Sequence, residues 1–166
     1  MKAPFRAVAL GPRDTGTVRR ADGTLLLRSP HPLRPYPNKI TERLVYWAEH
    51  APDRTFVAQR DATGAWRKLS YAETLAAVRC IGQALLRRPL STERTIAILS
   101  DNSIEHLLLA LAAKHVGIPY GPVSSAYSLV SDDFGKLRHV LGLLTPGLVF
   151  AQSGERFGRR CQEFEA

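Results

Sequence analysis

Residues 94–127 constrain the fold of this chain more than any other stretch. An apolar strand over 94–100 runs into a polar turn, a helix that is apolar nearly all round, and a second apolar strand over 118–123. This pattern predicts a βαβ unit whose strands pair in parallel through a right-handed crossover. A helix without a polar face must be covered on both sides. We therefore expect a layered α/β body larger than the rest of the chain easily supplies, and hence a chain that is part of something bigger.

The flanking segments predict further strands and helices in the order of an α/β domain. Extended runs around Asp22-Gly23 predict a β-hairpin near the N-terminus. Ser70 and Glu73 have the spacing of a capping box, which predicts that a helix begins there. Alternating prolines between 29 and 38 predict an extended linker. The other predicted elements are a helix over 40–51, strands over 55–60 and 65–69, a helix that opens at 131–133 and a strand over 148–151.

Together these elements predict an α/β fold, namely a partial layered α/β subdomain with a mostly parallel sheet, preceded by a β-hairpin arm. We expect three regions. A basic N-terminal arm with the hairpin and the proline-rich linker covers 1–39, and the layered body covers 40–152. A divergent, disordered tail is expected over 153–166, because no helical or strand periodicity continues beyond Gln152.

Most of the net charge of +8 lies near the N-terminus, because residues 1–43 carry nine Lys/Arg and three Asp/Glu. These cations are spread out, without interleaved aromatic residues or a helical stripe, so we expect no specific nucleic-acid partner. A basic nucleic-acid binder is the alternative, and it predicts steeply salt-dependent retention on DNA, whereas weak retention lost on deleting 1–43 would show only a charged arm. No apolar run approaches the ~20 residues of a membrane span. Since a signal-peptide pattern is also absent, we expect a cytoplasmic location and no membrane partner.

The cysteines and histidines do not suggest a metal centre. Cys80 and Cys161 make neither a disulfide framework nor a metal-binding pair. Cys80 falls on the apolar side of a helical pattern and is predicted to be a buried thiol. No metal ligand is expected, because no histidine partner with a spacing of four residues accompanies His31, His50, His106 or His115.

Ser124, Ser125 and Tyr127 are the candidate substrate-adjacent residues. They follow a predicted strand, at the sheet edge where doubly wound proteins bind ligands, and Tyr127 could line a pocket for an aromatic or acyl group. The alternative is a serine-rich loop whose tyrosine packs on the domain. A hydrolase triad of Ser124, Asp132 and His139 is disfavoured, because the serine lacks the G-x-S-x-G elbow.

The sequence offers no glycine-rich loop that could cradle a phosphate. The turn over 101–103 could offer backbone amides to an anion. Helix starts of this kind occur in most α/β proteins, however, so a structural role is favoured. We therefore assign no catalytic residue and no cofactor-binding residue from the pattern alone.

Four segments in a fixed order resemble the N-terminal part of AMP-forming acyl-CoA synthetases, members of the adenylate-forming superfamily. They are Pro-Asp-Arg-Thr-Phe at 52–56, Leu-Ser-Tyr-Ala-Glu at 69–73, Ile-Ala-Ile-Leu-Ser-Asp-Asn-Ser at 96–103 and Leu-Ala-Ala-Lys-His-Val-Gly-Ile-Pro at 111–119. Further loops are similar to the feruloyl-CoA synthase branch, at 20–24, 27–30, 122–130 and 134–139. The resemblance covers roughly 17–158, so the body over 40–152 is identified as the N-terminal part of an AMP-dependent ligase domain.

The resemblance implies a two-step ligase that uses ATP, Mg2+ and CoA. A carboxylic acid and ATP give an acyl-adenylate and pyrophosphate, and CoA then displaces AMP to give a thioester. The family's phosphate loop, its later adenylate-binding motifs and its catalytic lysine have no counterpart in this chain, so no catalytic residue is carried over. We expect a truncated reading frame or a split gene product that is inactive alone and binds none of these cofactors well.

Two roles remain open for such a chain. It is either the N-terminal portion of an acid–CoA ligase, with an aromatic acid such as ferulate as the substrate, or a non-catalytic module or remnant that docks to a complementary ligase half. In both cases the expected partner is the C-terminal ligase portion. Restored activity on co-expression with such a portion would favour the split enzyme, and absence of any interaction would favour a remnant.

Overall fold

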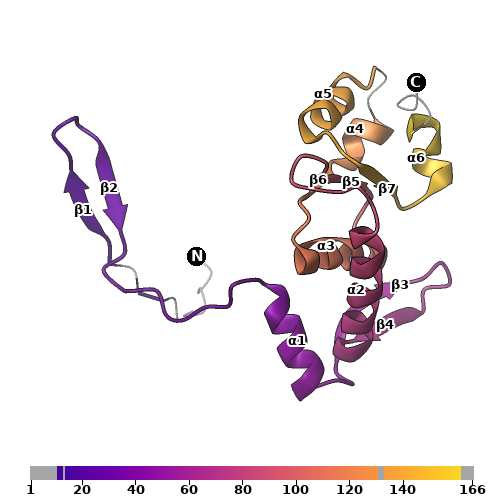
Figure 1. Ribbon diagram of the computed structural model, residues 1–166, viewed down its shortest axis with the longest axis horizontal. Coiled ribbons are helices and arrows are strands. Elements are labelled where there is room, and N and C mark those ends of the chain that lie inside the picture. The colour runs from indigo at the N-terminus through magenta and orange to yellow at the C-terminus, as the bar shows by residue number, and fades with distance from the viewer. Residues whose placement is uncertain (1–10, 13, 131–132, 162–166) are drawn as a thin grey trace, which may run out of the picture. The chain divides into compact units, whose positions relative to one another are not determined.

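The N-terminal arm forms the predicted hairpin. The computed structural model describes residues 11–12, 14–130 and 133–161, and the chain divides into two units, Met1–Tyr36 and Pro37–Ala166 (Figure 1). In the first unit, β1 (Gly16–Arg19) pairs antiparallel with β2 (Leu25–Arg28). Gly23 has a φ of 87° in the connecting turn, and the Thr24 amide donates to Asp22 Oδ1 at 2.9 Å. The Asp-Gly pair therefore makes the turn for the reason the sequence predicts, since glycine adopts positive φ without strain.

The second unit alternates helices and strands, as the sequence predicts. Its first half comprises α1 (Thr41–His50), β3 (Thr55–Arg60), β4 (Trp66–Ser70) and α2 (Tyr71–Leu86). Its second half comprises β5 (Ile96–Leu99), α3 (Ile104–Val116), β6 (Tyr120–Val123), α4 (Ser125–Leu129), α5 (Gly135–Leu144), β7 (Leu148–Ala151) and α6 (Gly154–Cys161). Within the described part of the chain, no helix is long and apolar enough to cross a membrane.

The start of α2 confirms the predicted capping box. Ser70 Oγ accepts from the Glu73 amide at 3.2 Å, and the Glu73 carboxylate accepts from the Ser70 amide at 2.7 Å. The prediction that Cys80 is buried is wrong, because its side chain is exposed. The inward face of α2 runs through Val78 and Leu85, and at 100° per residue Cys80 lies on nearly the opposite side of the helix.

The central sheet contains three parallel strands in the order β6-β5-β7. Every residue of β5 is buried, because the strand has a neighbour on each side and a hydrophobic cluster on each face. Ile96 and Ile98 belong to a cluster with α2 and α3, while Ala97 and Leu99 belong to a second cluster with Leu137 of α5 and with Phe157 of α6. The α/β fold with a parallel sheet and a preceding hairpin is therefore confirmed.

Helix α3 is covered on both sides, as its all-round apolar pattern requires. None of the residues 104–113 is exposed. Much of this cover comes from within the chain, because α3 packs against α2 and contacts β3 and α1, while its core residues also join Ile96 and Ile98 of β5. This differs from the expectation that the cover lay outside the chain. The helix is capped by Ser103, whose Oγ accepts from the His106 amide at 3.1 Å, and Gly117 ends it with a φ of 78°.

Two short helices occupy segments where the sequence predicts none. Ser125–Leu129 forms α4 in place of a serine-rich loop, and Gly154–Cys161 forms α6 in the region expected to be a disordered tail. Phe157 explains α6, because its side chain is fully buried in the second hydrophobic cluster. One buried aromatic residue anchors this polar helix, too little to produce a periodic pattern. Residues 162–166 of the expected tail lie outside the described residues.

Candidate functional site

The three parallel strands end at one edge of the sheet, and polar residues follow each of them. Ser100 and Asp101 come after β5, Ser124 and Ser125 after β6, and Gln152 and Ser153 after β7. An open cleft of about 720 Å3 lies at this carboxyl edge. Its lining consists of Ser100, Asp101, Asn102, His106, Pro122, Val123, Ser124 and Ser125. Because ligands of open α/β sheets bind at the carboxyl ends of the strands, this cleft is the candidate functional site.

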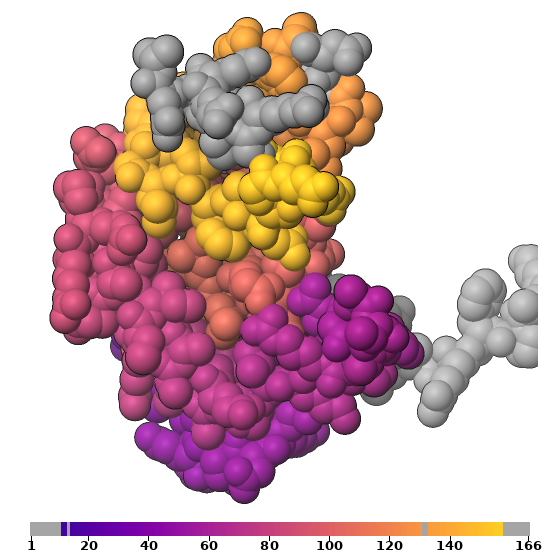
Figure 2. Space-filling view, turned by 90° about the vertical axis from the view of Figure 1, so that its right-hand side faces the viewer, coloured from indigo at the N-terminus to yellow at the C-terminus, as the bar shows by residue number. Residues whose placement is uncertain are grey.

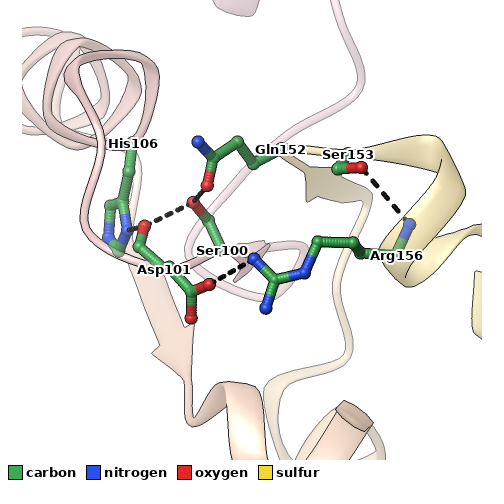
Figure 3. A network of polar contacts seen from close by, with 6 residues as sticks. All are labelled: Ser100, Asp101, His106, Gln152, Ser153 and Arg156. Carbon is green, nitrogen blue, oxygen red and sulfur yellow. Dashed lines mark hydrogen bonds and ion pairs between the residues drawn. The ribbon is translucent and has the colours of Figure 1, made fainter. Parts of the chain in front are cut away.

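Ser100 lies at the centre of a polar network that joins the ends of β5 and β7 (Figure 3). Its hydroxyl Oγ lies 2.6 Å from the backbone carbonyl of Asp101 and 3.0 Å from the side-chain oxygen of Gln152. The hydroxyl has one proton, so Oγ donates to one of these two oxygens at a time. With the Gln152 amide group rotated by 180°, its nitrogen would donate to Oγ instead. Nδ1 of His106 lies 3.3 Å from the same Asp101 carbonyl. The network fixes the β5–α3 turn against the loop after β7.

Asp101 is the charged residue of the cleft, and it is held from two sides. The pKa of Asp101 is held below its usual value, first by a side-chain hydrogen bond from Ser125 and second by the hydrogen bond and charge of Arg156. Arg156 Nη1 lies 2.7 Å from Asp101 Oδ2, and both side chains remain well exposed to solvent. The carboxylate therefore links β5, α4 and α6 at one point of the sheet edge.

Arg156 reaches Asp101 because α6 begins at Gly154, just after β7 ends at the carboxyl edge of the sheet. The Arg156 amide donates to Ser153 Oγ at 3.3 Å, which satisfies one of the free amides of the first turn. The next residue, Phe157, is buried in the cluster shared with Leu99 and Leu137. Two neighbouring residues of α6 thus fix the helix: Arg156 through its ion pair with Asp101, and Phe157 through its burial in the second hydrophobic cluster. In Figure 2, α6 lies at the surface of the molecule, in yellow.

We expect the Asp101 interactions to make stability depend on pH in the acid range. Because its pKa is lowered in the folded state, the carboxylate stabilises the fold above the ordinary value of 3.8, and this contribution is lost as pH falls through the lowered folded-state pKa. Urea unfolding at a series of pH values measures it. The stability difference between the native chain and Asp101→Asn should be largest above about pH 5 and shrink below 3.8.

The control for this measurement is Asp53→Asn, which removes an exposed carboxylate elsewhere in the chain. Its stability difference from the native chain should be smaller than that of Asp101→Asn at neutral pH. A difference between the native chain and Asp101→Asn that stays constant from neutral pH to pH 2 would contradict the assignment, because a depressed pKa requires linkage.

A second, more apolar groove of about 420 Å3 lies between β3 and α3. Its apolar lining includes Val57, Ile104, Leu107 and Ala110, and its polar groups come from Gln59, Asn102, Ser103 and His106. Gln59 Oε1 accepts from the Ile104 amide at 2.9 Å. Gln59 and Ser103 are thus engaged at the first turn of α3, and His106 Nδ1 lies against the Asp101 carbonyl, so we assign no ligand to this groove.

The structure brings two of the three predicted substrate-adjacent residues to the cleft. Ser124 and Ser125 line it, whereas Tyr127 packs against the second hydrophobic cluster, with Lys136 Nζ 5.7 Å from the centre of its ring. Contact of these residues with a substrate stays a prediction. The disfavoured triad gains no support, because His139 is exposed on α5 and Asp132 lies outside the described residues.

Sequence reasoning did not find the Asp101–Arg156 pair, Gln152 or the role of His106. The two charged residues are 55 positions apart, and no sequence pattern links Arg156 to the segment that contains Asp101. The available signal was positional, since each polar residue after a parallel strand must lie at the same sheet edge. Applied to all three strands rather than to the second alone, that rule points to Asp101 and Gln152 as well as Ser124.

The side chains that line the cleft do not form a binding site for a metal ion or for the phosphates of a nucleoside triphosphate. In the described part of the chain, no three His, Cys, Asp or Glu side chains come together in a metal-binding group. The cleft lining contains one carboxylate and no lysine or arginine, and Arg156 at its border is engaged by Asp101. A polyphosphate would meet a negative charge there without a free cation. We therefore derive no step of a reaction from this cleft.

The comparison with known families identifies the class of protein. A profile described as "AMP-binding enzyme" matches residues 44–163, which is most of the chain. The parallel sheet, its carboxyl-edge cleft and this match agree, so the chain belongs to the AMP-binding enzyme family of adenylate-forming enzymes. Enzymes of this family use ATP and Mg2+.

Individual relatives are much longer than the stretch that this chain matches. Luciferin 4-monooxygenase of Nipponoluciola cruciata is 33% identical over 82 residues, which cover 49% of this chain and 14% of the relative. A putative long-chain-fatty-acid CoA ligase from Rhodopseudomonas palustris, a solved structure, is 27% identical with a TM-score of 0.56, covering 68% of this chain and 26% of that one.

A fatty acyl-adenylate ligase from L. pneumophila, solved with acyl adenylate and pyrophosphate, has a TM-score of 0.62 at 11% identity and shows the shared fold alone. The match covers 70% of this chain and 20% of that structure. The chain therefore spans between a seventh and about a quarter of the length of these three relatives.

Proposed function

We propose that this chain is the N-terminal portion of an ATP-dependent, AMP-forming acid–CoA ligase. The observation that carries the proposal is the family match over 44–163, supported by the 27% identity to a putative CoA ligase. In the proposed reaction the acid's carboxylate oxygen attacks the α-phosphorus of ATP, and pyrophosphate leaves. The thiol sulfur of CoA, having lost its proton, then attacks the acyl carbon, and AMP leaves with the electron pair of the broken C–O bond.

The physical need for two steps lies in the carboxylate. A carboxylate is a poor electrophile, because its negative charge repels nucleophiles and an oxide is a poor leaving group. Bonding one oxygen to AMP removes the charge and provides a stable leaving group. An aromatic acid such as ferulate is the proposed substrate class, supported by the resemblance of the loops at 122–130 and 134–139 to the feruloyl-CoA synthase branch.

The chain's own residues have a scaffolding role in this proposal. The parallel sheet aligns the three strands, and the Ser100–Gln152 and Asp101–Arg156 contacts tie the segment after β5 to the segment after β7. The residues that contact ATP and CoA would belong to the remainder of the ligase. We therefore expect no turnover by the 166-residue chain alone.

ATP–pyrophosphate exchange tests the proposal directly. The purified chain is assayed with ferulate and with a long-chain fatty acid, alone and after co-expression with the part of the R. palustris ligase that follows the region matched by this chain. We expect background exchange from either piece alone and acid-dependent exchange from the pair. Turnover by the chain alone would refute the scaffolding role, and a co-purified pair without exchange would refute the ligase assignment.

A further inference from the structure

His115 lies in the last turn of α3, where this helix meets α2 and the segment that leads into α1. Its side chain is half-buried, and its ring nitrogen Nδ1 is buried without a hydrogen-bond partner in the described residues. Helix α3 packs against α2 (Figure 1). The two helices approach closely beside His115, because a Cβ on Gly82 of α2 would lie 2.9 Å from Cγ1 of Val116. This close packing separates Nδ1 from solvent.

Lys39 ties the start of α1 to the same turn of α3. Its Nζ donates to the His115 carbonyl at 3.4 Å, and such carbonyls at a helix C-terminus are often satisfied by a cation. The Lys39 carbonyl in turn accepts from the Glu42 amide at 3.1 Å, in the first turn of α1. Lys39 comes shortly after Tyr36, where the first unit of the chain ends. The contact with His115 therefore holds the residues with which the second unit begins.

The charged groups that act on the His115 ring are positive. Lys39 acts on it from the segment before α1, and Arg79 acts on it from α2, whereas no carboxylate of α1 or α2 is among these groups. Neither cation forms an ion pair with a carboxylate of the described residues. On α3 itself, Lys114 is directed to Tyr120, whose ring centre lies 5.5 Å from its Nζ. β3 contacts α3 along the apolar groove at the other end of the helix.

These surroundings oppose protonation of the ring. The C-terminus of a helix ordinarily favours a histidine cation. Here burial first, and the charges of Lys39 and Arg79 second, hold the pKa of His115 below its usual 6.5. A neutral ring with its proton on Nε2 leaves Nδ1 as an unpaired acceptor, whereas the imidazolium makes Nδ1 a buried donor without an acceptor. The charged ring is therefore more stable when the junction is open and Nδ1 meets water.

We propose that protonation of His115 releases the start of α1 from the end of α3, so that this junction is a pH-sensitive hinge at the beginning of the second unit. The new charge repels Lys39, and the first turn of α1 loses the support of the Lys39 contact. The direction follows from linkage: the junction is closed above pH 6.5, and opening increases as pH falls through 6.5 toward the lowered pKa of the closed form. The inference does not depend on the proposed ligase function, since no residue of the carboxyl-edge cleft takes part.

Amide hydrogen exchange of the full chain, measured by NMR at about pH 7.5 and about pH 5.5, tests the release. The rates are corrected for the intrinsic pH dependence of exchange. The Glu42 and Arg43 amides donate to carbonyls of the preceding turn at 3.1 Å each. Their protection should fall severalfold, with about tenfold as the limit, because an opened imidazole is about nine-tenths protonated at the lower pH. The Glu73 amide, which caps α2, is the internal control and should keep its protection. Unchanged protection at Glu42 and Arg43 would overturn the proposal.

Two histidine variants identify the group that titrates. His115→Gln cannot take up a proton, so the protection of Glu42 should stay constant over the same pH range. His50→Gln is the matched control, since His50 lies in the last turn of α1, and this variant should respond as the native chain does. Loss of the response in His50→Gln, or its persistence in His115→Gln, would overturn the proposal.

A third variant changes the charge around the ring and leaves the imidazole in place. Arg79 is exposed on α2, so Arg79→Gln removes one opposing charge while Lys39 keeps its contact. The midpoint of the His115 ring titration, followed by NMR, should move to higher pH. The acid-induced loss of Glu42 protection should then become smaller, because the closed and opened forms differ less in proton affinity. This measurement does not depend on the folding of His115→Gln. A native midpoint at or above 6.5, or an unchanged midpoint in Arg79→Gln, would overturn the proposal.

Discussion

Phe157→Ala should destabilise the chain by about 3–5 kcal/mol, which makes it one of the two most damaging substitutions we predict. Phe157 is fully buried and has the largest volume of the fully buried side chains in the described residues. Its removal leaves a cavity between α6 and the cluster that contains Leu99 and Leu137. Because α6 has no other described side chain in that cluster, the helix should also lose its position. Urea unfolding followed by circular dichroism measures the change.

Leu143→Ala is the control for this prediction. Leu143 is 71% exposed on α5, and its truncation should change stability by less than about 0.5 kcal/mol. If Phe157→Ala instead cost less than about 1 kcal/mol, the second cluster could not depend on α6.

Ile98→Ala should destabilise the chain by about 2–5 kcal/mol, because Ile98 lies at the centre of the sheet. It is fully buried, and its strand neighbours are Pro122 of β6 and Phe150 of β7. The side chain joins the cluster that α2 and α3 cover. The cavity would therefore open between the sheet and its helical layer, where the surrounding elements are least free to collapse. The free energy of unfolding in urea is the measurement.

Two companion variants make this prediction specific. Ile98→Val removes one methylene and should cost about 0.5–1.5 kcal/mol, which gives a graded series at one site. Ile40→Ala makes the same change at a residue that is 62% exposed and should cost less than about 0.5 kcal/mol. Equal losses from Ile98→Ala and Ile40→Ala would contradict the central position of β5.

Most of the elements could be predicted because their signals are local. Ser70 and Glu73 lie three residues apart and cap each other, and Asp22-Gly23 makes its turn within four residues. The two short helices could not be predicted in the same way. α4 spans five residues, and α6 is held by one buried aromatic side chain, so neither has enough turns to display an apolar stripe. Cys80 was predicted to be buried because apolar residues surround it in α2, but the buried face of this helix is narrower than its apolar pattern indicates.

The candidate site was predictable only in part. Ser124 and Ser125 could be placed at a sheet edge because a predicted strand precedes them. Asp101 and Arg156 could not be paired, because a salt bridge between residues 55 positions apart depends on the path of the intervening chain. Tyr127 has an aromatic ring suited to a pocket or to a core, and in the structure it packs, partly buried, against the second hydrophobic cluster.

The sequence by itself determined the secondary structure of the central βαβ unit, its parallel pairing and its resemblance to adenylate-forming ligases. Those properties follow from hydrophobic periodicity, caps and short motifs, which act over a few residues. Only the tertiary structure decided that β5 lies between β6 and β7 and that α2 covers α3. Strand order and the packing of helices on one another depend on contacts between residues far apart in the chain, and no local pattern encodes them.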